Sequence, residues 1–224
     1  MKLTNKLTSW IFLVTLFVSI IFAKNITSFA VSDTFFSNLR SRNTFTTEDF
    51  DPQINDNGYM VWKGFDGITT QIYLYDGKST KRISTIDGVT SNSRPQINDN
   101  GHVVWKGHDG TINQIYLYDG KNTKKISTID GVTSTNGPQI NDNGHVVWYG
   151  RDAITWQIYL YDGKNTSKIS IIEGVTSNFH PQINDNGQVV WRGRDERTGQ
   201  IYFYDGNNVS KIFTIAKVSF NNNP

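Results

Sequence analysis

One seven-residue string, Pro-Gln-Ile-Asn-Asp-Asn-Gly, occurs four times in this chain, and each copy begins 43 residues after the one before. The copies begin at Pro52, Pro95, Pro138 and Pro181. A fixed period of this length is typical of repeat proteins, in which a unit buries its apolar surface against neighbouring units. The repeat therefore predicts the organisation of the chain more firmly than any single strand does.

Each unit contains four short segments rich in Val, Ile, Tyr and Trp, the residue types that favour a pleated, partly buried strand. In the second unit the predicted strands are Pro95–Ile97, His102–Lys106, Gln114–Tyr118 and Lys125–Ile129. Asn-Asp-Asn-Gly before the second strand and Asp-Gly after the third predict hairpin turns, because Asn and Gly tolerate a positive φ. The glycines that close the first of these turns are Gly58, Gly101, Gly144 and Gly187.

The second and third strands are apolar on both faces, so both faces of each small sheet are expected to be covered. Stacked β-propeller blades provide that cover, and about 40 residues in four strands is the size of one blade. A β-solenoid is the alternative, whereas a helical solenoid is excluded because no window has apolar residues at helical spacing. The predicted fold is an all-β, propeller-type array of four four-stranded blades, which form a closed four-blade ring, an open arc or half of a larger ring.

The repeat also predicts boundaries along the chain. Residues 1–30 form a targeting segment and residues 31–51 an irregular lead-in. The four blades occupy residues 52–94, 95–137, 138–180 and 181–216, and residues 217–224 are the truncated start of a fifth repeat. In register with the repeat, residues 38–43 do not match a fourth strand, so no closing strand is expected before the first unit.

The N-terminus has the pattern of a secretory signal peptide. Lys2 and Lys6 precede an apolar run from Trp10 to Ala23, which is shorter than the roughly 20 residues that a membrane helix needs. Cleavage is expected after Ala23 or Ala30, and an uncleaved anchor is the alternative. In either case the chain is expected to be exported, to the periplasm, the extracellular space or the cell surface.

Charge and composition exclude several classes of function. The net charge is +2, and three of the lysines lie in the targeting segment, so the remainder is close to neutral. Nucleic-acid binding is not expected, because it requires a clustered basic surface. Cysteine is absent, which excludes disulfides, thiolate metal sites and a cysteine nucleophile.

The order of motifs within one unit resembles the TolB-like β-propeller repeat. That repeat has a proline, a Ser-Pro-Asp-Gly turn, an apolar strand, an Ile-Tyr pair, a further turn and a strand of basic and apolar residues. Here Asn-Asp-Asn-Gly replaces the first turn, and Ile115-Tyr116 matches the pair. The resemblance covers residues 52–215 and implies a propeller fold. It does not indicate TolB itself, because nothing here predicts the α/β domain that precedes the TolB propeller.

Recurring polar and aromatic residues have a structural and a functional interpretation. The Asn-Asp-Asn-Gly oxygens are compatible with calcium, but no distal acid completes a calcium loop, so a plain turn is favoured. Asp66, Asp109, Asp152 and Asp195 follow the second strand and are interpreted as turn caps rather than as a cation site. The second-strand tryptophans are interpreted as inter-blade packing rather than as a sugar platform, and they are Trp62, Trp105, Trp148 and Trp191.

The copies differ most in two places, the connection between the second and third strands and the segment between blades. The inter-blade differences are at Ser93-Arg94, Asn136-Gly137 and Phe179-His180. Because scaffold turns are constrained whereas binding loops diversify, these segments predict a ligand-binding rim. Its candidate residues are Arg151, Trp156, His180, Arg194 and Arg197.

The sequence thus predicts an exported, non-catalytic propeller that mediates protein or glycan interactions, without a metal or other cofactor. Catalytic residues are not expected, since there is no G-x-S-x-G elbow and no single pair of acids. Two alternatives remain, a propeller hydrolase or lyase acting on polysaccharide and a structural array at the cell surface. The array would form a homo-oligomer through open blade edges.

Overall fold

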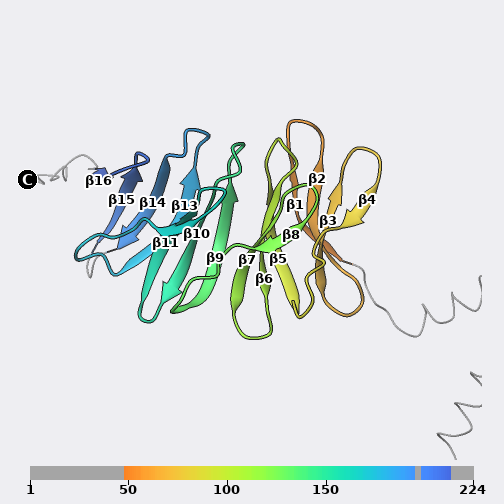
Figure 1. Ribbon diagram of the computed structural model, residues 1–224, viewed down its shortest axis with the longest axis horizontal. Coiled ribbons are helices and arrows are strands. Elements are labelled where there is room, and N and C mark those ends of the chain that lie inside the picture. The colour runs from red at the N-terminus through yellow and green to blue at the C-terminus, as the bar shows by residue number, and fades with distance from the viewer. Residues whose placement is uncertain (1–47, 195–197, 213–224) are drawn as a thin grey trace, which may run out of the picture. The chain divides into compact units, whose positions relative to one another are not determined.

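The computed structural model of the chain describes residues 48–194 and 198–212. The predicted targeting segment, Arg197 and the predicted start of a fifth repeat lie outside these residues. The described part is all-β with four strands in each repeat unit, which confirms the fold predicted from the repeat (Figure 1). None of it forms a helix of the length and apolar character that a membrane span requires.

The first two blades are separate antiparallel sheets. The first contains β1 (Asp49–Ile54), β2 (Met60–Phe65), β3 (Thr70–Tyr75) and β4 (Thr80–Arg82). The second contains β5 (Ser91–Ile97), β6 (Val103–His108), β7 (Asn113–Tyr118) and β8 (Thr123–Lys125). In each sheet the strands pair in chain order, so a blade is an up-and-down meander.

The third and fourth blades have the same meander but are joined. The third contains β9 (Val132–Ile140), β10 (Val146–Asp152), β11 (Thr155–Tyr161) and β12 (Thr166–Lys168). The fourth contains β13 (Ser177–Ile183), β14 (Val189–Arg194), β15 (Gly199–Tyr204) and β16 (Val209–Ile212). One parallel pair, Trp156 with Ser177, connects β11 to β13, so the two blades form one eight-stranded sheet.

The first strand of each blade is longer than the sequence predicts. β5 begins at Ser91 rather than Pro95, because residues 91–93 pair with the end of β6. These residues are polar and differ between copies, so they carry no strand pattern. In the first blade the same extension places Asp49–Asp51 in β1, and this part of the predicted irregular lead-in belongs to the blade.

The middle strands match, but the fourth strand is shorter than predicted and lies earlier in the chain. β8 covers Thr123–Lys125, so it shares only Lys125 with the predicted Lys125–Ile129. The amide of Ile115 donates to the hydroxyl of Ser127 (2.8 Å) instead of to a backbone carbonyl, so the ladder between β7 and β8 stops there.

The core lies between blades rather than within them. Val61 and Ile72 of the first blade pack in one cluster with Val103, Trp105 and Tyr116 of the second. Equivalent clusters join the second blade to the third and the third to the fourth. Trp105, Trp148 and Trp191 are almost completely buried at the junctions between blades, whereas Trp62 in the first blade is only partly buried. Each is stacked on the tyrosine opposite it in the third strand.

An asparagine couples the buried tryptophan to the preceding blade. Asn92 accepts a hydrogen bond from the indole N–H of Trp105 (2.8 Å) and donates to the carbonyl of Thr70 in the first blade (2.9 Å). Asn178 makes the same pair of contacts, to Trp191 and to the carbonyl of Trp156. A polar side chain thus fixes both the tryptophan orientation and the spacing of two blades.

The Asn-Asp-Asn-Gly turns form a second link between blades, a ladder of hydrogen bonds. The side-chain amide of Asn55 donates to the carbonyl of Asn98 (2.9 Å), and the backbone amide of Asp56 donates to the carboxylate of Asp99 (3.0 Å). The side-chain amide of Asn57 donates to the carbonyl of Asp99 (2.7 Å). The same three bonds join the second turn to the third and the third to the fourth. In every case the earlier blade donates and the later blade accepts.

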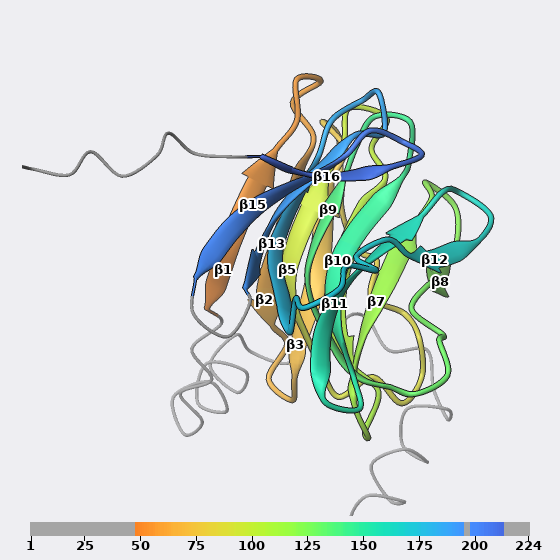
Figure 2. The same cartoon turned by 90° about the vertical axis from the view of Figure 1, so that its left-hand side faces the viewer.

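The described blades form an open row. Figure 1 shows them side by side in chain order, with β1–β4 and β16 at opposite ends. Turned by 90°, the sheets of successive blades lie one behind another (Figure 2). The described residues form no closed four-blade ring, and their open row is compatible with the two other arrangements that the sequence predicts, an open arc and half of a larger ring.

The third unit lacks the asparagine bridge, and this absence predicts a stabilising substitution. Thr135 stands where the second and fourth units have Asn92 and Asn178, and its hydroxyl donates to the carbonyl of Asn113 (2.9 Å). Among the described residues the buried indole N–H of Trp148 has no hydrogen-bond partner. Thr135→Asn supplies both bonds and is expected to raise the free energy of unfolding by about 1 kcal/mol. Thermal unfolding measures the change.

The matched control is the reverse change. Asn92→Thr removes the acceptor from Trp105 and is expected to lower the free energy of unfolding by about 1–3 kcal/mol. If Thr135→Asn left the unfolding midpoint unchanged while Asn92→Thr lowered it, the unpaired indole would not be a source of instability.

Candidate ligand-binding groove

Each first strand contains a β-bulge at the residue before proline. The pairing register of β5 with β6 shifts between Ser93 and Gln96. At the bulge φ is 52° for Asp51, 56° for Arg94, 60° for Gly137 and 55° for His180. The left-handed region is costly for residues other than glycine, and the residue before proline ordinarily adopts extended backbone. Three units keep a strained, non-glycine residue here, and a bulge re-aims the side chain that it carries.

This position corrects the sequence interpretation of the inter-blade segments. Arg94, Gly137 and His180 were expected in connections between blades, at a rim shared with the loops between second and third strands. They lie instead within β5, β9 and β13, in the ladder with the second strand of the same blade.

A groove of about 490 Å³ crosses the bulges of the first three blades. Each of these blades contributes one glutamine from its Pro-Gln-Ile segment, and the charged residues come from the first two. The lining residues are Asp51, Gln53, Lys63, Ser93, Arg94, Pro95, Gln96, Gly137, Pro138 and Gln139. The groove is therefore lined by Pro and Gln residues that recur in each copy of the repeat and by charged residues that differ from blade to blade.

Positive charge gathers at this groove. Lys63 lies 3.6 Å from the carboxylate of Asp51 and over the ring of Phe50. Lys106, which pairs with Ser93 across β5 and β6, forms no ion pair with any described residue. Partial burial lowers the pKa of Lys106, and the positive charges of Arg94 and Lys63 lower it further. The three cations thus include a partly buried amine whose charge is not neutralised.

An aromatic cluster lies beside the third and fourth blades. Tyr149 occupies the position of Lys106 in the third unit, and its ring contacts Trp156, Phe179 and His180 at centroid distances of 5.5, 5.6 and 6.0 Å. A side chain at Gly137 would come within 2.6 Å of the Tyr149 ring, so only glycine at this bulge accommodates the tyrosine. Since Gly137 also lines the groove, the cluster lies next to it.

The predicted rim residues have different positions. Trp156 and His180 are brought together in the aromatic cluster, the first partly buried and the second exposed. Arg151 and Arg194 are exposed near the ends of β10 and β14. In the backbone register Arg151 lies opposite Trp156 of β11, and Arg194 lies opposite Ser177 of β13. Arg197 lies outside the described residues.

The sequence interpretation did not select Lys63, Arg94 and Lys106 as site residues. The residue after each repeated tryptophan is Lys63, Lys106, Tyr149 and Arg192. The residue at the bulge also differs between the four copies, as Asp51, Arg94, Gly137 and His180. A comparison of the copies at the two positions together would have indicated the groove.

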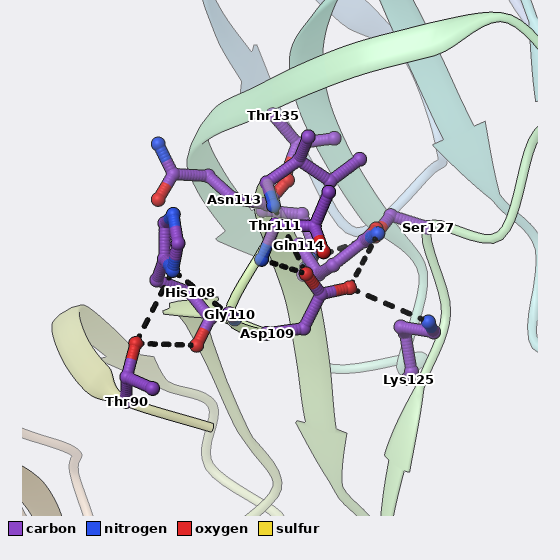
Figure 3. A network of polar contacts seen from close by, with 12 residues as sticks. Thr90, His108, Asp109, Gly110, Thr111, Asn113, Gln114, Lys125, Ser127 and Thr135 are labelled. Atoms are coloured by element: carbon purple, nitrogen blue, oxygen red, sulfur yellow. Dashed lines mark hydrogen bonds and ion pairs between the residues drawn. The ribbon is translucent and has the colours of Figure 1, made fainter. Parts of the chain in front are cut away.

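The turn between β6 and β7 holds its aspartate tightly (Figure 3). Asp109 accepts hydrogen bonds from the amides of Thr111 and Ile112 and from the side chain of Gln114. The bond from Ile112 is the main cause that holds the pKa of Asp109 below its usual value. Gln114 in turn accepts a bond from Ser127 (2.6 Å), which connects the turn to the core.

Asp66 has the same contacts in the first blade, so these carboxylates cap their own turns. Within the described residues no group of three or more His, Asp or Glu side chains is placed to hold a metal ion. The expectation of no cofactor remains a prediction.

Comparisons with known proteins show the fold. No family model matches the chain, and no curated protein does. TolB from Acinetobacter baumannii superposes with a TM-score of 0.54 at 17% identity, over 74% of this chain and 43% of TolB. This chain has the fold of a TolB-like β-propeller. The likeness confirms the resemblance read from the repeat.

Two further structures support the same fold. The β-propeller domain of the Trilobed protease from Pyrococcus furiosus, which has an open velcro topology, gives a TM-score of 0.53 at 14% identity, over 79% of this chain and 54% of that domain. Acylaminoacyl peptidase from Pyrococcus horikoshii gives 0.53 at 15% identity, over 76% and 27%. The TolB-like propeller described here spans less than two thirds of each of these chains.

The left-handed backbone at the bulge predicts that Arg94 lowers the stability of the fold. Arg94→Gly relieves the left-handed backbone and is expected to raise the free energy of unfolding by about 1 kcal/mol. Arg192→Gly removes the same charge from an exposed strand residue without a positive φ and is expected to lower stability. Chemical denaturation of both variants measures the difference. Equal destabilisation by both would show that Arg94 is not strained.

Proposed function

We propose that this chain is an exported, non-catalytic propeller module that binds an acidic protein or glycan partner in the groove of its first three blades. The observation that carries this proposal is that Lys63 and Arg94 line the groove. Lys106 is close enough for both charges to lower its pKa, and it has no counter-ion among the described residues.

Electrostatics favours an anionic ligand. Partial burial lowers the pKa of Lys106, and the positive charges of Arg94 and Lys63 destabilise its charged form further. A carboxylate bound between Lys106 and Arg94 would remove the repulsion and gain charge-assisted hydrogen bonds. The groove is open and polar, which suits an extended chain rather than a small buried substrate.

The aromatic cluster adds a second chemical character. His180 is exposed and Phe179 partly exposed beside the groove, and both rest against the buried ring of Tyr149. Aromatic side chains contact both sugar rings and apolar side chains, and Tyr and Trp are enriched at protein interfaces. A partner with acidic groups spaced along an apolar or sugar backbone matches both ends of the site.

Export is proposed from the sequence. The basic and apolar pattern of residues 1–30 is that of a signal peptide, with an uncleaved anchor as the alternative. The partner is accordingly expected in the periplasm, in the extracellular space or at the cell surface.

The absence of a catalytic role is also part of the proposal. A polysaccharide hydrolase needs two carboxyl groups facing one bond, and Asp66 and Asp109 are engaged by their own turns. Asp51 is paired with Lys63. The binding interpretation uses the groove as the described residues form it, whereas hydrolysis would need acids that are free.

A binding assay tests the groove directly. Calorimetric titration of the chain with polygalacturonate and with a poly-glutamate peptide is expected to show salt-sensitive binding of at least one of them. The double variant Arg94→Gln with Lys106→Gln is expected to weaken that binding by about tenfold or more, or about 1.4 kcal/mol.

The matched control removes the same charge elsewhere. Lys121→Gln with Lys164→Gln changes two exposed lysines in the turns after the third strands and is expected to leave the affinity unchanged. Binding of neither polyanion, or an equal loss in both double variants, would contradict the proposed site.

A further inference from the structure

The two ends of the blade row are exposed in complementary ways. At the first blade, Ile54 is 68% exposed and Met60 40%, and they line a mainly apolar groove of about 460 Å³ together with Phe50 and Trp62. At the last blade, Val190, Ile201 and Ile212 are 39%, 42% and 46% exposed. Apolar side chains of this size at both ends indicate surfaces that associate with another structure.

Repeat register identifies what fits each end. One unit earlier, the counterparts of Val190, Ile201 and Ile212 are Val147, Ile158 and Ile169, which are 0%, 0% and 7% exposed. They are buried by the face of the fourth blade that carries Val189 and Trp191. The corresponding face of the first blade carries Met60 and Trp62. The last blade therefore has the surface that packs against a face like that of the first blade.

The hydrogen-bond ladder has the same polarity. Every internal junction joins donors of the earlier turn to acceptors of the later turn. At the last blade no described residue accepts from the amide of Asp185, and the side-chain amide of Asn184 turns back to Gln188 (2.9 Å). At the first blade no described residue donates to the carboxylate of Asp56. One end thus keeps the ladder's donors and the other its acceptors.

We propose that a second copy of this chain docks head to tail, with the last blade of one copy against the first blade of the other. The contact repeats the internal junction: Val190 and Ile201 cover Trp62 and Met60, and the turn at Asp185 donates to the turn at Asp56. Such a contact is heterologous, so two copies that close on each other use both ends and form an eight-blade ring. This assembly is independent of the ligand proposed for the groove.

The contact is of a kind that the chain already makes three times. A fourth junction uses the same positions for its apolar side chains and its ladder groups. The asparagine bridge is not repeated there, because Asp49 stands at the position of Asn92 and Asn178. The apolar substitutions at the ends are conservative. Met60 replaces a valine and Phe203 a leucine, and both remain apolar.

Sedimentation of the full chain from about 1 to about 100 µM tests for association, a range in which a contact of micromolar affinity is resolved. Mass spectrometry of the same sample records whether the N-terminal segment is retained. The expected species is a dimer. A monomer throughout this range would overturn the proposal.

Single-face variants test the head-to-tail geometry. Ile54→Lys blocks only the first-blade face and Ile201→Lys only the last-blade face, and both positions are exposed, so the blades are expected to fold. Each variant alone is expected to be monomeric, since every contact needs one face of each kind. An equimolar mixture is expected to form a heterodimer, because each variant supplies the face that the other lacks.

The matched control is Ile68→Lys with Ile154→Lys, which places the same charges at isoleucines that are 89% and 84% exposed in turns between second and third strands, outside the apolar groove of the first blade. It is expected to dimerise like the unaltered chain. Persistence of the dimer in Ile201→Lys alone, or failure of the mixture to pair, would overturn the head-to-tail contact. Circular dichroism and thermal unfolding establish that each variant is folded.

Discussion

A four-stranded sheet with apolar residues on both faces cannot cover itself, and the structure of this chain follows from that constraint. Each blade leaves one face to the blade before it and the other to the blade after it, with a tryptophan buried at every described junction. Dispersion and apolar burial provide the attraction, but they are not directional. Direction comes from polar groups: the asparagine that connects Trp105 to Thr70, and the ladder of turns in which an amide of one blade meets an oxygen of the next.

The groove is a consequence of the same repetition. Because the first strand of each blade contains a bulge before proline, that position recurs in every unit, and in the first three blades it lines one groove. The four-stranded meander and its Asn-Asp-Asn-Gly turn recur in each copy, whereas the bulge residue and the residue after tryptophan differ. Charge from the first two blades and aromatic rings from the last two are thereby set next to each other without any change in the fold. In the third unit the varied residue also takes part in a junction, because Tyr149 belongs to the core cluster between the third and fourth blades.

Much of this could be predicted from the sequence, and the rest could not for identifiable reasons. The period, the turn at Asn98–Gly101 and the burial of Trp105 followed from residue types and spacing. The ladder did not, because the partners of Asn55 lie in the next unit and the turn alone looks self-sufficient. The bulge at Arg94 contradicts the usual preference of a residue before proline for extended backbone, so sequence placed it in a connection between blades. The lowered pKa of Lys106 depends on its burial and on charges from other strands, Arg94 and Lys63, and no local sequence pattern indicates these.

Hydrogen exchange at the turn aspartates tests the central claim most directly, that junctions between blades are directional and stop at the last blade. In dilute monomeric chain, the amides of Asp56, Asp99 and Asp142 each donate to the next blade, whereas among the described residues Asp185 has no such acceptor. The account predicts slow exchange for the first three amides and fast exchange for Asp185. Equal exchange rates at all four positions would contradict it.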